Sequence, residues 1–206
     1  MEETSARSLY AVHVQTGSED LIRRLIGVLI DDLGPGSTFI PERIYYFKAA
    51  RKWHKLTREL FPGYIFIRTD DAERLFFNLK KVPEFTNLLH DGDYTFVEIS
   101  GQDLAFIELL CSLSISELRP ARGEATRFIL PGSRVEIIPE EDIQPGDIIM
   151  PKSKGEVVRV LDGPLMKLST YVSSIDFKSR TAILDKDICK AHKIHLGIRL
   201  PKDCAK

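Results

Sequence analysis

Hydrophobic and polar positions in the first half of the chain follow two periods, which predicts a mixture of strands and helices. Alternation with a period of two predicts a strand at 9–16, and β-rich runs predict further strands at 39–49, 60–69, 85–90 and 94–97. Apolar residues at helical spacing predict three helices, which begin near Ser18, Asp70 and Ser100. At the second of these, Asp70 is the expected cap and Glu73 lies three residues further on.

The predicted order is β-α-β-β-α-β, with an added short strand and helix. This order is typical of an α+β fold, the ferredoxin-like split βαβ sandwich, in which two helices cover one face of a mostly antiparallel sheet. We therefore expect the other sheet face to be open to a partner.

The helical period disappears in the second half of the chain. Short β-prone runs alternate with turn signals at 134–138, 148–150, 156–161, 170–175, 182–184 and 194–200, which predicts a small all-β barrel. The polar stretch 119–126 contains Pro120 and Gly123 and is typical of a linker. We expect a first domain at 1–115, a linker at 116–133 and a barrel at 134–206. The residues leave the start of the second domain open between 128 and 150.

Composition excludes several classes of protein. The 206 residues are 43% hydrophobic and 29% charged, as in soluble globular proteins. No run approaches the roughly 18 apolar residues that span a bilayer, and the first residues lack the features of a secretion signal. The three cysteines have no C-x-x-C spacing, which disfavours a disulfide framework or a zinc site and fits a reducing cytoplasm. They are Cys111, Cys189 and Cys204.

The sequence also disfavours an enzyme. Only His192 and His195 are closely spaced among the histidines, and no third metal ligand accompanies them. The turn Gly34-Pro35-Gly36 lacks the lysine and hydroxyl of a phosphate-binding loop. No nucleophile can be paired with a base. We therefore expect no catalytic residue, no metal and no cofactor.

The net charge of −1 means that contact with nucleic acid requires a local basic patch. One patch lies at the predicted hairpin connection, where five cations occur in 11 residues without an acid. They are Lys48, Arg51, Lys52, Lys55 and Arg58. Trp53 lies among them and is able to stack on an unpaired base. The alternative is a solvated loop whose Trp53 folds back onto the sheet.

A second basic stretch lies near the C-terminus. Its cations are Lys186, Lys190, Lys193 and Arg199. They are candidate contacts to RNA or to a partner protein, but lysines at exposed strand edges also prevent aggregation.

Four segments resemble the NusG family of transcription elongation factors. LFPGYIFI at 60–67 resembles the family's F-P-G-Y strand, and LYAVHVQT at 9–16 resembles its W-Y-x-V-x-T start. KKVPEFT at 80–86 resembles the N-V-P-G-V-T segment. VRVLDGPL at 158–165 resembles the V-R-V-x-x-G-P-F opening of the family's KOW domain. Their order and spacing across most of the chain make the resemblance specific.

The chain departs from the family pattern at four places. Leu9 replaces a tryptophan, Glu84 a glycine, and Thr170 the glycine expected after the G-P turn; 134–153 has no counterpart in the housekeeping factor. These departures make the chain resemble specialised paralogues such as the LoaP or RfaH antiterminators.

The resemblance implies an NGN-like domain that binds RNA polymerase, followed by a KOW-like barrel. In the family the F-P-G-Y strand binds the clamp coiled coil of the large polymerase subunit, which implies contacts here from Tyr64, Phe66 and Leu88. Tyr64 and Phe66 share one strand face. The resemblance places that face on the open side of the sheet, whereas the residues alone also allow both rings in the core. The start of the second helix, 70–78, would face the gate loop.

A factor that bridges the polymerase cleft favours processive elongation because it binds the elongating state better than the paused one. The further partners implied are a DNA or RNA recruitment element, and a ribosomal protein or termination factor at the barrel. We expect a cytoplasmic monomer without a membrane partner. The alternative function is a stand-alone RNA-binding or ribosome-associated protein, in which both predicted folds also occur.

Overall fold

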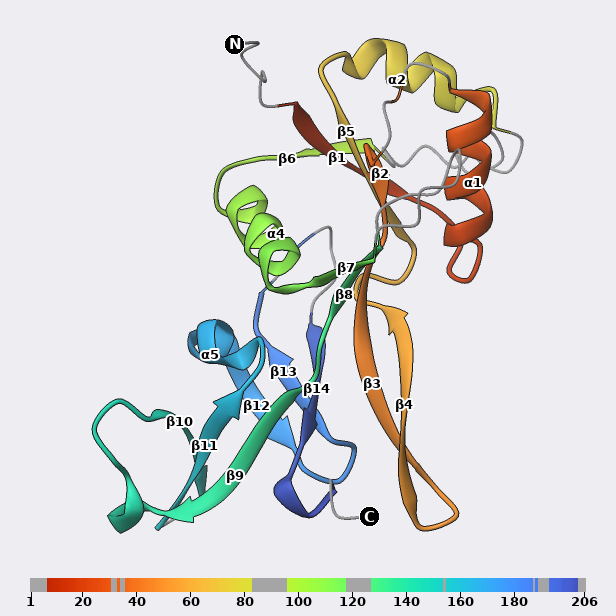
Figure 1. Cartoon of the computed structure of the whole chain (residues 1–206). Helices are drawn as coiled ribbons and strands as arrows, with labels where there is room; N and C mark the ends of the chain where they lie inside the picture. The colour runs from red at the N-terminus through yellow and green to blue at the C-terminus, as the bar shows by residue number, and fades with distance from the viewer. Residues whose placement is uncertain are drawn as a thin grey trace. The chain divides into compact units, whose positions relative to one another are not determined.

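The computed structural model describes residues 7–30, 33, 36–82, 96–117, 127–153, 155–186, 188 and 193–203. The chain forms two compact units (Figure 1). The first contains Met1–Pro41, Phe61–Ser112 and Ser116–Phe128, and the second contains Glu42–Leu60, Leu113–Ile115 and Ile129–Lys206. A segment from the first half of the sequence therefore belongs to the second unit.

The first unit contains a four-stranded antiparallel sheet in the order β2-β5-β1-β6. Its strands are β1 (Ser8–His13), β2 (Thr38–Phe39), β5 (Tyr64–Thr69) and β6 (Phe96–Ile99). Helix α1 (Glu19–Leu29) joins β1 to β2, and α2 (Ala72–Leu79) lies between β5 and β6 in the chain. This order confirms the split βαβ sandwich. The predicted strand at 85–90 lies outside the described residues.

Helices α1 and α2 cover one face of this sheet (Figure 1). Val12 and Ile65 are cross-strand partners on that face, and both are fully buried. They pack in one cluster with residues of both helices, among them Ile22, Ile26, Leu75 and Leu79. The spacing of these apolar side chains at three and four residues is what turns one stripe of each helix towards the sheet.

The opposite face of the sheet is not open, so this part of the prediction is wrong. A third helix, α4 (Gly101–Leu113), lies on that side (Figure 1), and Glu108 of α4 forms an ion pair with Arg68 of β5 at 3.7 Å. Phe66, on the same strand face as Arg68, is 0% exposed. Its ring stacks on Phe39 with centroids 5.6 Å apart. Hydrophobic burial on both faces makes this sheet the centre of the first unit.

The second unit contains a curled six-stranded sheet in the order β10-β11-β9-β14-β13-β12, which forms a nearly closed barrel and confirms the KOW-like prediction. Its strands are β9 (Ser133–Pro139), β10 (Ile148–Ser153), β11 (Glu156–Asp162), β12 (Val172–Asp176), β13 (Thr181–Leu184) and β14 (Ile194–Arg199). A short helix, α5 (Leu165–Leu168), follows the Asp162-Gly163-Pro164 turn. Leu165 N donates to Ser133 Oγ at 3.0 Å, which fastens that turn to β9.

The second unit also contains the hairpin of β3 (Pro41–Ala49) and β4 (Lys52–Glu59). Two residues form its turn, Ala50 and Arg51, with φ angles of 47° and 65°. Strand β3 lies between β4 and β8 (Arg127–Leu130) in a sheet of order β4-β3-β8-β7, where β7 is Ile115–Glu117. β7 and β8 therefore fall inside or beside the stretch predicted as a linker.

One local prediction about a helix start is wrong. The cap of α2 is Asp71 rather than Asp70, because the Asp71 carboxylate accepts from Arg74 N at 2.8 Å. Ser18 precedes α1 but makes no side-chain cap; its hydroxyl donates to Gln15 O at 2.6 Å. Among the described residues, no helix is long and apolar enough to cross a membrane.

Candidate functional site

The F-P-G-Y segment forms a tight turn that leads into β5. Tyr64 N donates to Phe61 O at 3.1 Å, and Gly63 has φ of +83°, a conformation that side chains rarely adopt. Gly63 O accepts from Val14 N at 2.7 Å, and a Cβ at Gly63 would lie 3.2 Å from Val14 O. Glycine is therefore required here both by backbone conformation and by the close approach of β1.

A buried carboxylate holds this turn. Glu19 is 3% exposed. Its Oε1 accepts from Gly63 N at 2.7 Å, and its Oε2 accepts from Gly17 N at 2.6 Å. A carboxylate that accepts from backbone N–H groups satisfies donors that would otherwise be buried without a partner. Glu19, the first residue of α1, thereby positions the strand that carries Tyr64. Its position in the first helical turn did not predict this role.

Three residues lie at the surface where the β1–β5 strand pair ends: His13, Pro62 and Tyr64. We call them the Tyr64 edge. Tyr64 is half-buried, while His13 and Pro62 are exposed. The rings of His13 and Tyr64 lie 5.0 Å apart because the two residues are cross-strand partners. Phe66 does not join them. The prediction that its ring is exposed is wrong, since Phe39 and Phe61 enclose it. Leu88 lies outside the described residues.

The five cations predicted at the hairpin are all exposed. The β3–β4 register divides the hairpin into two faces, because directly paired residues point the same way. Lys48, Trp53 and Lys55 lie on one face, with Lys48 paired to Trp53 and Tyr46 paired to Lys55. Lys52 and Arg58 lie on the other, and Arg51 is in the turn. The cluster therefore presents cations on both faces and at the tip.

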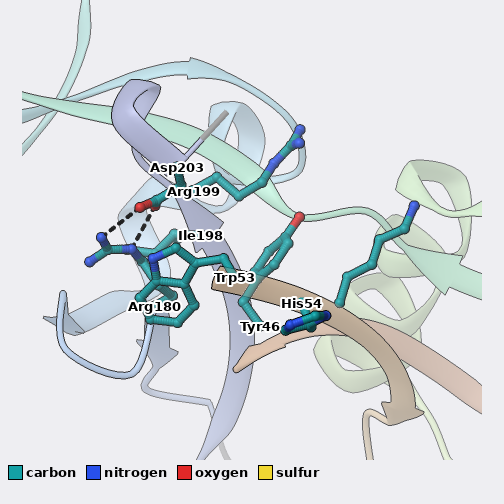
Figure 2. A pocket seen from close by; sticks show the side chains of 8 residues that line it. Tyr46, Trp53, His54, Arg180, Ile198, Arg199 and Asp203 are labelled. Atoms are coloured by element: carbon teal, nitrogen blue, oxygen red, sulfur yellow. Dashed lines mark hydrogen bonds and ion pairs between the residues drawn. The ribbon is translucent and has the colours of Figure 1, made fainter. Parts of the chain in front are cut away.

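Trp53 does not project fully into solvent. It is half-buried, and the Arg180 guanidinium lies 4.6 Å from its ring centroid. Asp203 holds that guanidinium through Nε at 2.6 Å and a terminal nitrogen at 2.8 Å (Figure 2). The base-stacking role predicted for Trp53 is therefore limited by a partner from the barrel that lies over its ring.

A comparison with protein families identifies the first half of the chain. A family model described as "Transcription termination factor nusG" matches residues 7–108. The chain belongs to the NusG family. A search of the curated proteins finds no match to the chain.

Membership of the NusG family makes the chain a transcription factor of the elongation and antitermination class. NusG-family proteins bind RNA polymerase and are not enzymes. The matched range includes the Tyr64 edge, the Glu19 carboxylate that holds the Gly63 turn, and α2. Within the described ranges, no group of His, Cys, Asp or Glu side chains is arranged to hold a metal ion.

The NusG-family domain has a groove at the start of α2, in the range predicted to face a gate loop. Its volume is about 440 Å³. Asp70, Asp71, Arg74 and Asn78 line its polar side, while Ile30 and Leu75 are among its apolar residues. Because Asp71 is already the helix cap and Asn78 Oδ1 accepts from Lys81 Nζ at 2.7 Å, Asp70 is the residue more available to a partner.

The basic residues predicted in the barrel differ in their exposure. Lys193 is exposed, Lys186 and Arg199 are half-buried, and Lys190 lies outside the described residues. Arg199 ends β14, where its guanidinium lies 5.9 Å from the Tyr46 ring. On the same strand, burial lowers the pKa of His195, and the nearby positive charges of Arg43 and Lys193 lower it further.

Proposed function

We propose that this NusG-family protein binds RNA polymerase through its first unit and promotes processive elongation, and that a nucleic-acid element recruits it to specific operons. The observation that carries the proposal is the family match over 7–108, which includes a tyrosine left at the surface by a turn that a buried carboxylate holds. The Tyr64 edge is the proposed contact to the clamp coiled coil of the large subunit. Phe66 supports that contact from within the core.

The chemistry of the Tyr64 edge suits a helical tip. Tyr64 and His13 present rings with polar atoms, and Pro62 adds an apolar surface that is already fixed in conformation. Rigid aromatic side chains bury a large area with little loss of entropy, so a few of them dominate many interfaces. Asp70 at the α2 groove is the proposed contact to the gate loop.

The hairpin supports the nucleic-acid part of the proposal. Five exposed cations in an 11-residue stretch without an acid attract phosphate, although the whole chain has a net charge of −1. The barrel is the proposed contact to a ribosomal protein or termination factor. We place the protein in the cytoplasm as a monomer.

A gel-shift titration tests the polymerase contact. Core polymerase assembled on a nucleic-acid scaffold is titrated with the wild-type chain and with Tyr64→Ala. We expect the variant to bind at least about tenfold more weakly, as truncation of a central aromatic contact does. Leu21→Ala, an exposed apolar residue of α1, is the control and should bind normally. Equal binding by wild type and Tyr64→Ala would contradict the proposal.

The hairpin also favours a second candidate, a stand-alone RNA-binding protein. This candidate predicts salt-sensitive RNA binding without polymerase and no co-migration with elongation complexes. Both candidates allow binding to the scaffold alone, so co-migration with the polymerase complex in the same gel is what separates the two functions.

A further inference from the structure

A cavity in the second unit lies between the hairpin and the end of the barrel (Figure 2). Its volume is about 160 Å³. This space holds roughly five waters, so it suits one small group rather than a whole cofactor. The residues that matter to its chemistry are Tyr46, Trp53, Lys55, Arg180, Arg199 and Asp203.

The cavity is a built feature, because two glycines allow Tyr46 to reach the barrel. A Cβ at Gly132 would lie 2.6 Å from Tyr46 Cε2, and a Cβ at Gly197 would lie 3.0 Å from two carbons of the same ring. The Cβ at Gly197 would also collide with the backbone carbonyl of Ile44. Neither glycine has a positive φ, so glycine is required at these positions because a Cβ does not fit, and not by backbone conformation.

The only carboxylate among these lining residues is fully engaged. Both oxygens of Asp203 accept from Arg180, and Oδ2 also accepts from Leu200 N at 2.8 Å. These hydrogen bonds and the charge of Arg180 outweigh burial and lower the pKa of Asp203. Arg180 and Asp203 therefore cancel each other. Lys55 and Arg199 remain as the uncompensated charges of the cavity.

Arg199 lines the cavity from the end of β14. A guanidinium forms strong charge-assisted hydrogen bonds with phosphate oxygens. Lys55 lines the same cavity from the hairpin. One cation from the hairpin and one from the barrel therefore line the same cavity.

We propose that this cavity binds a phosphate group of a DNA or RNA strand that runs along the hairpin. Arg199 and Lys55 hold the phosphate, Tyr46 shapes the wall, and the contact of Trp53 with Arg180 keeps hairpin and barrel together. This inference deepens the nucleic-acid part of the proposed function and does not depend on polymerase binding. It makes Arg199 of the barrel part of the same nucleic-acid site as Lys55 of the hairpin.

The chain contains a single tryptophan, so tryptophan fluorescence reports directly on this cavity. The experiment titrates the full chain with single-stranded DNA and with RNA of the same sequence at several salt concentrations. The readouts are Trp53 emission and anisotropy of the labelled strand. We expect saturable changes in both. The DNA and RNA arms show which strand supplies the phosphate.

Arg199→Gln should weaken strand binding about tenfold and reduce the slope of log K against log salt by about one, because one phosphate contact is lost. Lys167→Gln on α5, an exposed cation outside the cavity, is the matched control and should bind as the wild type does. Circular dichroism and urea unfolding of both variants verify that the fold is kept.

Gly197→Ala provides an independent arm, since it removes no charge. We expect it to displace Tyr46 and the hairpin, shift Trp53 emission before any strand is added, and weaken binding as Arg199→Gln does. The inference is overturned if Arg199→Gln binds with wild-type affinity and salt slope while Lys52→Gln, on the other hairpin face, loses binding. That result would leave the proposed function intact, because the gel shift with Tyr64→Ala tests it separately.

Discussion

Strand β5 and the β3–β4 hairpin are neighbours in sequence but differ in almost every physical respect. Three consecutive residues of β5, Ile65 to Ile67, are fully buried, and helices cover both faces of their sheet. The hairpin exposes all five of its clustered cations and belongs to the second unit. β5 is a core strand with one end at the surface, whereas the hairpin is a surface element with a few buried residues.

This difference teaches what the F-P-G-Y signature reports. Phe61 and Phe66 fill the core, and Gly63 permits the turn, so most of the motif is required by the fold. Only Pro62 and Tyr64 remain for a partner. The hairpin sequence is the reverse case, because its cations serve no core and Pro41 and Tyr46 are the only buried residues of β3 and β4. The resemblance of β5 to the family is therefore stronger evidence for a shared fold than for a contact with polymerase.

The largest effect is expected from Phe66→Ala. Removing a fully buried ring that contacts Phe39 and Phe61 should cost about 3–5 kcal/mol in the free energy of unfolding. Urea denaturation measures it. If Phe66→Ala keeps wild-type stability and only loses polymerase binding, then β5 is a contact strand like the hairpin. That result would contradict the contrast between the two elements.

Glu19→Ala should have the next largest effect. It leaves Gly17 N and Gly63 N without their acceptor, at a cost of roughly 3 kcal/mol. Glu19→Gln retains one acceptor oxygen and should lose about half as much. Asp20→Ala, at an exposed position of the same helix turn, is the control. Equal stability of the Ala variants at positions 19 and 20 would contradict the role of Glu19 in holding the Gly63 turn.

Acid should destabilise the second unit through His195. Burial, with Arg43 and Lys193 nearby, lowers the pKa of this imidazole below its ordinary value of 6.5. The unfolded chain therefore takes up a proton that the folded chain resists, so stability is full above about pH 6.5 and falls as the pH drops below it. Thermal melts between pH 7.5 and 5 measure this loss. His195→Gln should flatten it, and an unchanged slope would contradict the assignment.

The smallest effect concerns the hairpin turn. Ala50 and Arg51 both have positive φ, where side chains other than Asn, Asp and Gly are strained. Ala50→Asn should stabilise the protein by about 1 kcal/mol, a rise of roughly 2–4 °C in Tm. Strand binding should not change, because no cation is removed. A lower Tm would show that this turn is not strained.

Local patterns predicted most of the elements, because period and caps are properties of neighbouring residues. The alternation of β5 placed Tyr64 and Phe66 on one face, but the cover over that face comes from α4, which is apolar on most sides and gave no directional stripe. The roles of Glu19 and Trp53 depend on partners far along the chain, Gly63 and Arg180. Such pairings arise only when the chain is folded, so no local pattern contains them.

The most direct test of the account is photo-crosslinking in assembled elongation complexes. A benzoylphenylalanine replaces Tyr64 in one variant and Lys48, on the Trp53 face of the hairpin, in another. Each complex is irradiated and its crosslinked partner is identified. We predict that position 64 crosslinks to the large polymerase subunit and position 48 to a nucleic-acid strand. A crosslink from position 64 to nucleic acid, or none to polymerase, would contradict the central claim that the Tyr64 edge binds the enzyme.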